Sequence, residues 1–245
     1  MNRRAQLICI CCGPVLMVLF AIGWVGLGRF LPPWVGARDS PAQTARIFWD
    51  HADRIRIGVV FTILSMGMLA PWGSALAAQT RRREGRFPVL AYAQVTCIGA
   101  ATAMILAACV FWGVATYRPH AVSPQLVQLC HDVGWFFFLY TWPAFSLWAA
   151  FVGLAILLDQ VEYGVYPRWA GYLSIFVALD IAPGGIIIFF KHGAFSWSGA
   201  IALYVPVGAF FIWLVAMTTL TLKNIQKGLH EEAAASLDSA IGDST

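Results

Sequence analysis

The sequence predicts an all-α membrane protein, a polytopic bundle of six transmembrane helices, and two observations predict it. Hydrophobic residues make up 60% of the 245-residue chain and charged residues only 11%, whereas soluble domains carry about 25% charged residues. In addition, six apolar stretches each reach the length of about 20 residues that a helix needs to cross a bilayer. This composition excludes a water-soluble domain, and the 14% of aromatic residues excludes a disordered chain.

The six predicted spans are each bracketed by charged residues. They cover residues 8–28, 57–78, 88–116, 133–158, 169–190 and 198–222. The first span follows Arg3 and Arg4 as the core of a signal peptide would. However, its apolar run continues to Gly28 without a small-residue cleavage pattern, so we expect it to remain as a membrane helix. Residues 1–227 then form one transmembrane domain.

The segment 30–56, between the first two spans, predicts an interfacial helix on the outer side of the membrane. Asp39 or Ser40 can cap the start of this helix, and Pro41 suits its first position because proline has no N–H to leave unbonded there. Apolar side chains further along can contact the membrane surface. We expect this helix to lead directly into the second span.

The orientation follows from the arginines between the second and third spans, Arg81, Arg82, Arg83 and Arg86. Short loops rich in Lys and Arg stay in the cytoplasm, so this loop and, with six spans, both termini are predicted to be cytoplasmic. The expected location is the bacterial inner membrane. Residues 228–245 are small and polar, with several acidic side chains, and predict a disordered cytoplasmic tail.

Asp180 is the strongest candidate for a functional residue. It lies about halfway along the fifth span, where a charge costs a few kcal/mol. Pro183, three residues later, removes a backbone donor and frees carbonyls one turn back, which predicts a kink. Asp180 can therefore act as a proton donor, an ion ligand or a polar anchor for a ligand. Alternatively, it only bonds the freed backbone or a hydroxyl group of a neighbouring helix.

The fourth span carries an aromatic stripe at helical spacing. Its members are Trp135, Phe138, Trp142 and Phe145. Such a stripe can form the wall of a pocket for a flat or polyene-like apolar ligand. Packing against neighbouring helices, or a position in the interfacial belt, is the alternative. Pro143 predicts a second kink, next to this stripe.

Several histidines fall on the predicted outer side, near an aspartate. His51, His131, His192 and Asp132 are the candidate metal ligands, because imidazole and carboxylate together can bind a metal ion or a haem iron. None of them forms the i,i+4 pair of a helical metal motif. The sequence therefore predicts no metal site, identifies no cofactor, and leaves solvated histidines as the ordinary interpretation.

Two stretches resemble an uncharacterised family of bacterial six-helix integral membrane proteins. They are Tyr166–Tyr172, with the sequence YPRWAGY, and Phe189–Trp197, with the sequence FFKHGAFSW. The similarity extends from Leu31 to about Ile225. The resemblance implies six spans, and it implies no activity, cofactor or catalytic residue.

Two functions are compatible with these features. The first is an integral membrane protein that binds or passes a lipophilic small molecule, or is a subunit of a larger membrane complex, with Asp180 and the aromatic stripe at the site. The second is an intramembrane enzyme acting on an isoprenoid or other lipid, with Asp180 as a general acid kept neutral by apolar surroundings. The predicted partners are the lipid bilayer, a lipophilic small molecule and membrane proteins. Nucleic acid is excluded, because the net charge of +4 comes from short clusters beside the spans.

Overall fold

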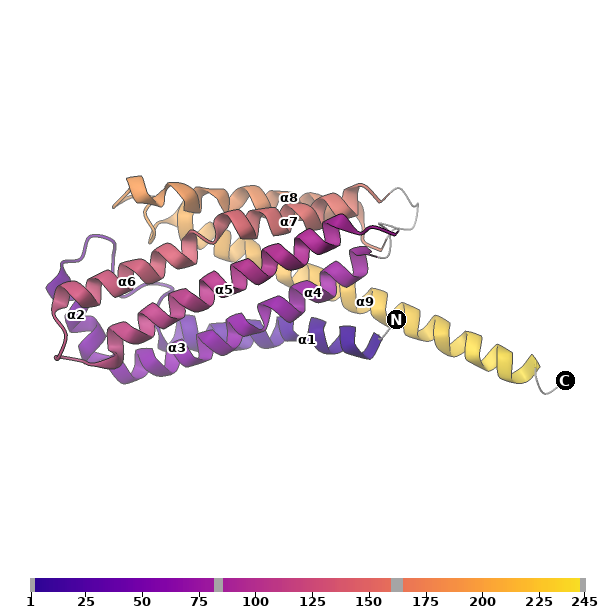
Figure 1. Ribbon diagram of the computed structural model, residues 1–245, viewed down its shortest axis with the longest axis horizontal. Helices are drawn as coiled ribbons and strands as arrows, with labels where there is room; N and C mark the ends of the chain where they lie inside the picture. The colour runs from indigo at the N-terminus through magenta and orange to yellow at the C-terminus, as the bar shows by residue number, and fades with distance from the viewer. Residues whose placement is uncertain (1–2, 82–85, 160–164, 243–245) are drawn as a thin grey trace.

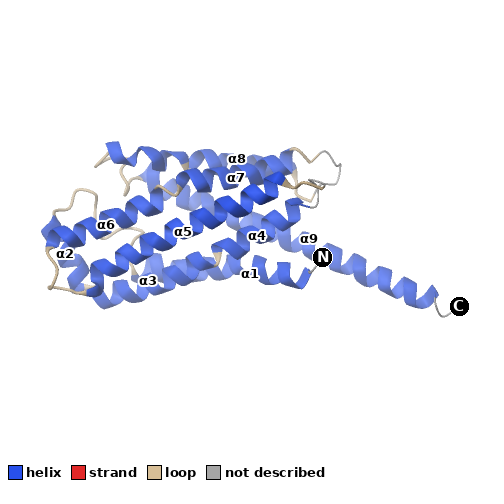
Figure 2. Ribbon diagram, in the orientation of Figure 1, coloured by secondary structure: helices blue, strands red, loops and turns tan. Residues whose placement is uncertain are grey.

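The computed structural model describes residues 3–81, 86–159 and 165–242, and in these ranges the chain forms helices and no β-strand. The helices form an elongated bundle (Figures 1 and 2). Their bounds are α1 Arg3–Phe20, α2 Pro41–Asp50, α3 Ala52–Gly67, α4 Leu69–Thr80, α5 Val89–Tyr117, α6 Pro124–Leu139, α7 Trp142–Leu157, α8 Arg168–Asp180 and α9 Val205–Gly242. Three shorter segments extend them: a π-helical segment Ala21–Leu27 after α1, a 3-10 segment Ala182–Phe189 after α8 and a π-helical segment Ala200–Tyr204 before α9.

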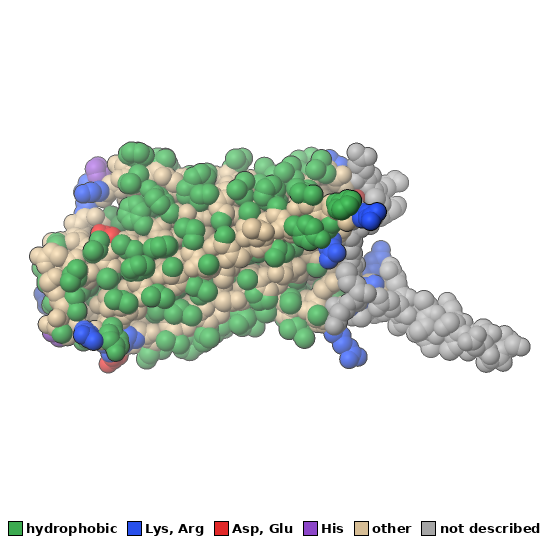
Figure 3. Space-filling view, in the orientation of Figure 1, with side chains coloured by type: hydrophobic (Ala, Val, Ile, Leu, Met, Phe, Trp, Pro, Cys, Tyr) green, Lys and Arg blue, Asp and Glu red, His purple; other side chains and the backbone are tan. Residues whose placement is uncertain are grey.

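Six helical stretches are long and apolar enough to cross a membrane, which confirms the predicted fold class. They are Arg3–Leu27, Ala52–Thr80, Val89–Tyr117, Pro124–Leu157, Arg168–Phe189 and Ala200–Gly228. On the face shown in Figure 3, hydrophobic side chains cover the bundle between its two ends, and charged side chains gather at these ends. The chain is therefore an integral membrane protein.

Both ends of the membrane domain lie at the same end of the bundle. Arg3 Nη1 donates a hydrogen bond of 3.4 Å to the carbonyl oxygen of Ile225, near the end of the last span. At the same end, Gln79 Nε2 donates to Gln6 Oε1 at 2.6 Å, which places the end of α4 and the adjacent Arg81 beside α1. The arrangement agrees with an even number of spans, and the cytoplasmic location of this end stays a prediction.

The helix predicted within residues 30–56 starts where the sequence predicts. Ser40 is the cap of α2: its hydroxyl accepts from the backbone N–H of Gln43, while the Gln43 side chain accepts from the backbone N–H of Ser40. A single residue, His51, joins α2 to the second span. His51 has non-helical backbone angles (φ −120°, ψ 22°), so the span begins at Ala52 rather than at residue 57.

Five of the six spans are interrupted, and only α5 crosses the described bundle as one regular α-helix. The interruptions lie at Phe20, Met68, Tyr140–Thr141, Ile181 and Tyr204–Val205. Three of them are followed within two residues by a proline, namely Pro143, Pro183 and Pro206, which cannot donate a backbone hydrogen bond to the preceding turn. The α-helix is therefore broken at the two places where the sequence predicts kinks, next to Pro143 and Pro183.

The first and second spans approach each other through glycines. A Cβ atom added to Gly58 of α3 would lie 2.5 Å from the backbone nitrogen of Gly28, and one added to Gly23 would lie 2.7 Å from the carbonyl oxygen of Gly58. Only hydrogen atoms fit at these positions, so the two backbones touch.

The core contains two groups of packed aromatic rings. The Trp135 cluster joins six rings from three spans and two loops: Trp24, Phe30, Trp112, Trp135, Phe138 and Trp197. The Trp148 cluster joins five rings from α4, α7 and α9: Trp72, Phe145, Trp148, Phe210 and Trp213. Offset and edge-to-face ring pairs of this kind fix the positions of the helices that carry them.

The segment predicted to be a disordered tail, residues 228–245, begins inside a helix. α9 continues without interruption to Gly242, and residues 243–245 lie outside the described ranges. Alanine and glutamate, which are frequent between residues 231 and 235, are strong helix formers. The low hydrophobicity of this segment explains the absence of a predicted span there, but it does not prevent a helix from continuing.

Candidate functional site

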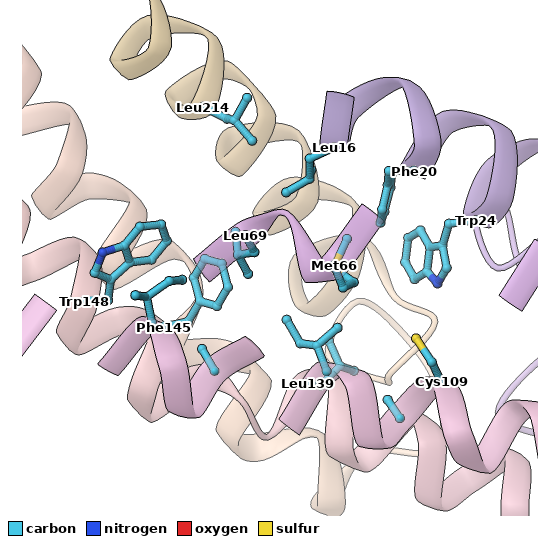
Figure 4. Packing of buried hydrophobic residues seen from close by; sticks show 14 of the residues in the cluster. Leu16, Phe20, Trp24, Met66, Leu69, Cys109, Leu139, Phe145, Trp148 and Leu214 are labelled. Carbon is cyan, nitrogen blue, oxygen red and sulfur yellow. The ribbon is translucent and has the colours of Figure 1, made fainter. Parts of the chain in front are cut away.

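A cavity lies where the interruptions of the spans meet. Its volume is about 90 Å³. Its wall is formed by residues at or near each interruption and by one residue of α5: Phe20, Met66, Leu69, Ile105, Phe138, Leu139, Thr141, Trp142, Phe145, Ile181, Gly184, Ala202, Leu203, Pro206, Val207, Phe210 and Phe211. In Figure 4, side chains from several of these helices converge on this space.

The wall of this cavity is apolar. Among the described residues that form it, none carries a charged side chain, and Thr141 is the one with a hydroxyl. The proton of that hydroxyl is already used, because Thr141 Oγ1 donates at 2.8 Å to the carbonyl oxygen of Phe137, and its oxygen can only accept a further hydrogen bond. The cavity is several times larger than the roughly 10–15 Å³ that one water molecule needs, yet it lacks the two or more polar partners that hold a buried water. Its chemistry suits an apolar occupant.

Two glycines let the fifth span close one side of the cavity. A Cβ atom on Gly184 would lie 2.9 Å from the carbonyl oxygen of Leu139, and one on Gly185 would lie 2.7 Å from Trp142 Nε1. The 3-10 segment can therefore rest directly on the junction between α6 and α7. Larger residues at these positions would push the two spans apart.

The aromatic stripe predicted for the fourth span is divided by the structure. Phe138, Trp142 and Phe145 line the cavity. Trp135 does not: it is fully buried in the Trp135 cluster, where it stacks on Trp197 with ring centroids 4.6 Å apart. Trp135 and Phe138 both belong to α6, but Trp135 lies one turn further from the α6–α7 junction, so it packs in the aromatic cluster instead of lining the cavity.

Asp180 lies beside the cavity without forming part of its wall. It is the last residue of α8, and the next residue, Ile181, is a wall residue. Its side chain is half-buried, and the buried Oδ2 atom has no hydrogen-bond partner among the described residues. Neither the freed backbone nor a neighbouring hydroxyl group bonds this oxygen, and no acidic side chain is found among the described residues of the cavity wall. The position of Asp180 therefore adds no support to its predicted role as a general acid.

The candidate metal ligands are not brought together. No group of three or more His, Cys, Asp or Glu side chains that could hold a metal ion is found among the described residues. His51 packs against Trp34, with ring centroids 4.4 Å apart, and His192 is exposed. His131 lies 3.6 Å from Asp132 but is buried inside α6, where its Nε2 accepts a hydrogen bond of 3.0 Å from Trp135 Nε1.

The sequence analysis missed the contributions of the first, second and sixth spans to the cavity. Phe20, Met66 and Phe210 are examples, and each lies within an ordinary apolar run. The local signals were prolines inside the apolar runs, such as Pro71 in the second span and Pro206 in the sixth, because such a proline predicts an interruption of the helix. Nothing in the linear sequence indicates that the interruptions lie at the same depth.

The chain was also compared with protein-family models, curated proteins and solved structures, and none of them matches it. The predicted resemblance to a bacterial six-helix family therefore stays a prediction.

Proposed function

We propose that this protein binds a lipophilic small molecule inside the membrane, in the cavity at the interruptions of its spans. The observation that carries the proposal is the composition of the wall, which is built from six spans and holds no charged side chain and a single hydroxyl group, that of Thr141, among the described residues. A pocket of this kind favours burial of apolar groups and offers nothing to a hydrated solute.

The position of the cavity supports the same proposal. Irregular backbone at membrane depth is tolerated where it is buried in protein or lines a cavity. Here the interruptions of five spans surround a single space, although regular helices would be the simplest way to cross a bilayer. A binding site accounts for both the interruptions and the space between them.

The other predicted roles rest on fewer features. Transport of the molecule, a place in a larger membrane complex and intramembrane catalysis by Asp180 stay predictions. Binding in the cavity needs no titratable group, so we expect Asp180→Asn to bind as the unmodified protein does. Loss of binding in Asp180→Asn would instead show that binding depends on the carboxyl group, because asparagine can still form hydrogen bonds but cannot ionise.

The experiment is extraction of the purified protein with organic solvent, followed by mass spectrometry of the released lipophiles. We expect a lipophile to be retained by the unmodified protein and lost from Ala202→Phe, because Ala202 is a buried wall residue and the larger ring fills the cavity. Ala103→Phe is the matched control, since Ala103 is an exposed alanine of α5 outside the wall.

Both variants are checked for folding by gel filtration and thermal unfolding before extraction. The proposal fails if the unmodified protein retains no lipophile, or if Ala202→Phe, correctly folded, retains as much as Ala103→Phe.

A further inference from the structure

The wall of the cavity has a buried part and a part-exposed part. Met66, Leu69 and Ile105 belong to the buried part. The part-exposed wall residues, which we call the mouth, are Phe138, Trp142, Ile181, Val207, Phe210 and Phe211. They come from the α6–α7 junction, the end of α8 and the start of α9. The cavity therefore opens where the fourth, fifth and sixth spans face one another.

The mouth opens at membrane depth. Ile181 is 13 residues from the start of α8, which places it about 20 Å along the helix, well within the roughly 30 Å of hydrocarbon that a span crosses. Leu179 and Ile212, beside the mouth on α8 and α9, are among the most exposed apolar side chains of their helices. What surrounds the mouth is therefore lipid chains rather than water.

The size of the cavity limits what can enter. Its volume of about 90 Å³ is smaller than the roughly 150 Å³ of a dry apolar cavity that takes up a benzene ring. A thin, flexible chain fits such a space better than a fused ring system does.

We propose that the mouth is a lateral portal, through which the hydrocarbon chain of a membrane lipid enters the cavity directly from the bilayer. This inference rests on the proposed function and adds the class of ligand, a linear acyl or polyprenyl chain, and its route. A chain that enters sideways keeps its headgroup at the membrane surface, so the cavity needs no polar group to receive it.

The experiment uses the full-length protein in lipid vesicles and two photoactivatable probes. One is a phosphatidylcholine with a diazirine at the end of its acyl chain, and the other is a polyprenyl phosphate with a diazirine at the end of its chain. After illumination, labelled residues are located by mass spectrometry of peptides. We expect label at Met66, which is only 5% exposed and is reached through the cavity.

Two residues serve as internal controls. Ile212 is 66% exposed on the outer surface of α9, so both probes label it whether or not the cavity is entered. Met217 is fully buried and lies outside the cavity wall, so it stays unlabelled. Label at Met66 without label at Met217 supports entry into the cavity.

A pair of variants tests the route. Val207→Trp places a large ring at the mouth, and we expect it to lower labelling of Met66 at least five-fold while labelling of Ile212 is unchanged. Val215→Trp is the matched control, because Val215 is 47% exposed on the same helix and is not a wall residue. It leaves labelling of Met66 as it is in the unmodified protein.

The outcomes separate this inference from the proposed function. If a lipophile is retained on purification but neither probe labels Met66, or if Val207→Trp and Val215→Trp label it equally, the portal is wrong and binding stands. If no lipophile is retained and Met66 is unlabelled, both proposals fail. Labelling of Met66 by one probe alone supports the portal and identifies the chain as acyl or as polyprenyl.

Discussion

The indole nitrogen of Trp72 donates a hydrogen bond of 2.9 Å to the hydroxyl oxygen of Thr218, 146 residues further along the chain. This bond joins α4 to α9 in the buried interior. α1 packs on the same pair, because a Cβ atom on Gly13 would lie 2.7 Å from the Trp72 indole and 2.9 Å from Thr218 Oγ1. Trp72 belongs to the Trp148 cluster, whose members Phe145 and Phe210 also line the cavity. The bond therefore helps to fix the position of the Trp148 cluster, two members of which form part of the cavity wall.

We expect Thr218→Val to lower the free energy of unfolding by about 1–3 kcal/mol, because it removes the acceptor and leaves a buried indole N–H without a partner. The measurement is thermal unfolding in detergent. Thr219→Val is the control: Thr219 is exposed, and its hydroxyl bonds only the carbonyl oxygen of Val215 in its own helix. Equal destabilisation by the two variants would show that the Trp72 bond contributes nothing specific.

The number of spans could be predicted from the sequence, whereas the site could be predicted only in part. A membrane helix is a local property, because about 20 apolar residues suffice for it. A cavity between interrupted helices is not local. Phe138 and Phe145 were identified because they recur at helical spacing within one span. Met66 and Phe210, on the second and sixth spans, meet them only after the bundle has assembled.

The position of His131 shows a local signal that the sequence analysis did not use. The fourth span was predicted to begin at residue 133, which left His131 in an outer loop. In the structure α6 begins at Pro124, directly after Ser123, so His131 lies inside the helix and is buried. Another Ser-Pro pair, Ser40-Pro41, correctly predicted the start of α2. The helix start at Ser123-Pro124 was overlooked because polar residues in the first turns of α6 lower the average hydropathy there.

We expect His131→Leu to destabilise the protein by about 1–3 kcal/mol, because the buried Trp135 indole N–H would lose its acceptor. Thermal unfolding in detergent measures the effect. His192→Leu, at an exposed histidine, should change stability by no more than about 0.5 kcal/mol. If His131→Leu proves as stable as the unmodified protein, the hydrogen bond to Trp135 is not needed for packing of this cluster.

The contact between Gly185 and Trp142 makes the cavity wall sensitive to a single methyl group. A Cβ atom on Gly185 would lie 2.7 Å from Trp142 Nε1 and 2.8 Å from Trp142 Cε2, well inside van der Waals contact. The indole has to move, and because Trp142 lines the cavity, the shape of the wall changes with it. We expect Gly185→Ala to lower the amount of lipophile retained on purification about three- to ten-fold, as measured by mass spectrometry of the extracted protein.

Two further variants show whether the indole is the cause. Gly208→Ala is the control, since a Cβ atom on Gly208 would meet no atom within 4 Å, and it should retain as much lipophile as the unmodified protein. Combining Gly185→Ala with Trp142→Phe replaces the indole by a smaller ring and relieves the clash, so we expect retention to recover in part. If the double variant retains less than Gly185→Ala alone, Trp142 acts as a direct contact of the ligand whose loss outweighs the relief. If Gly185→Ala itself retains the full amount, the wall adapts and the close approach at Gly185 does not control binding.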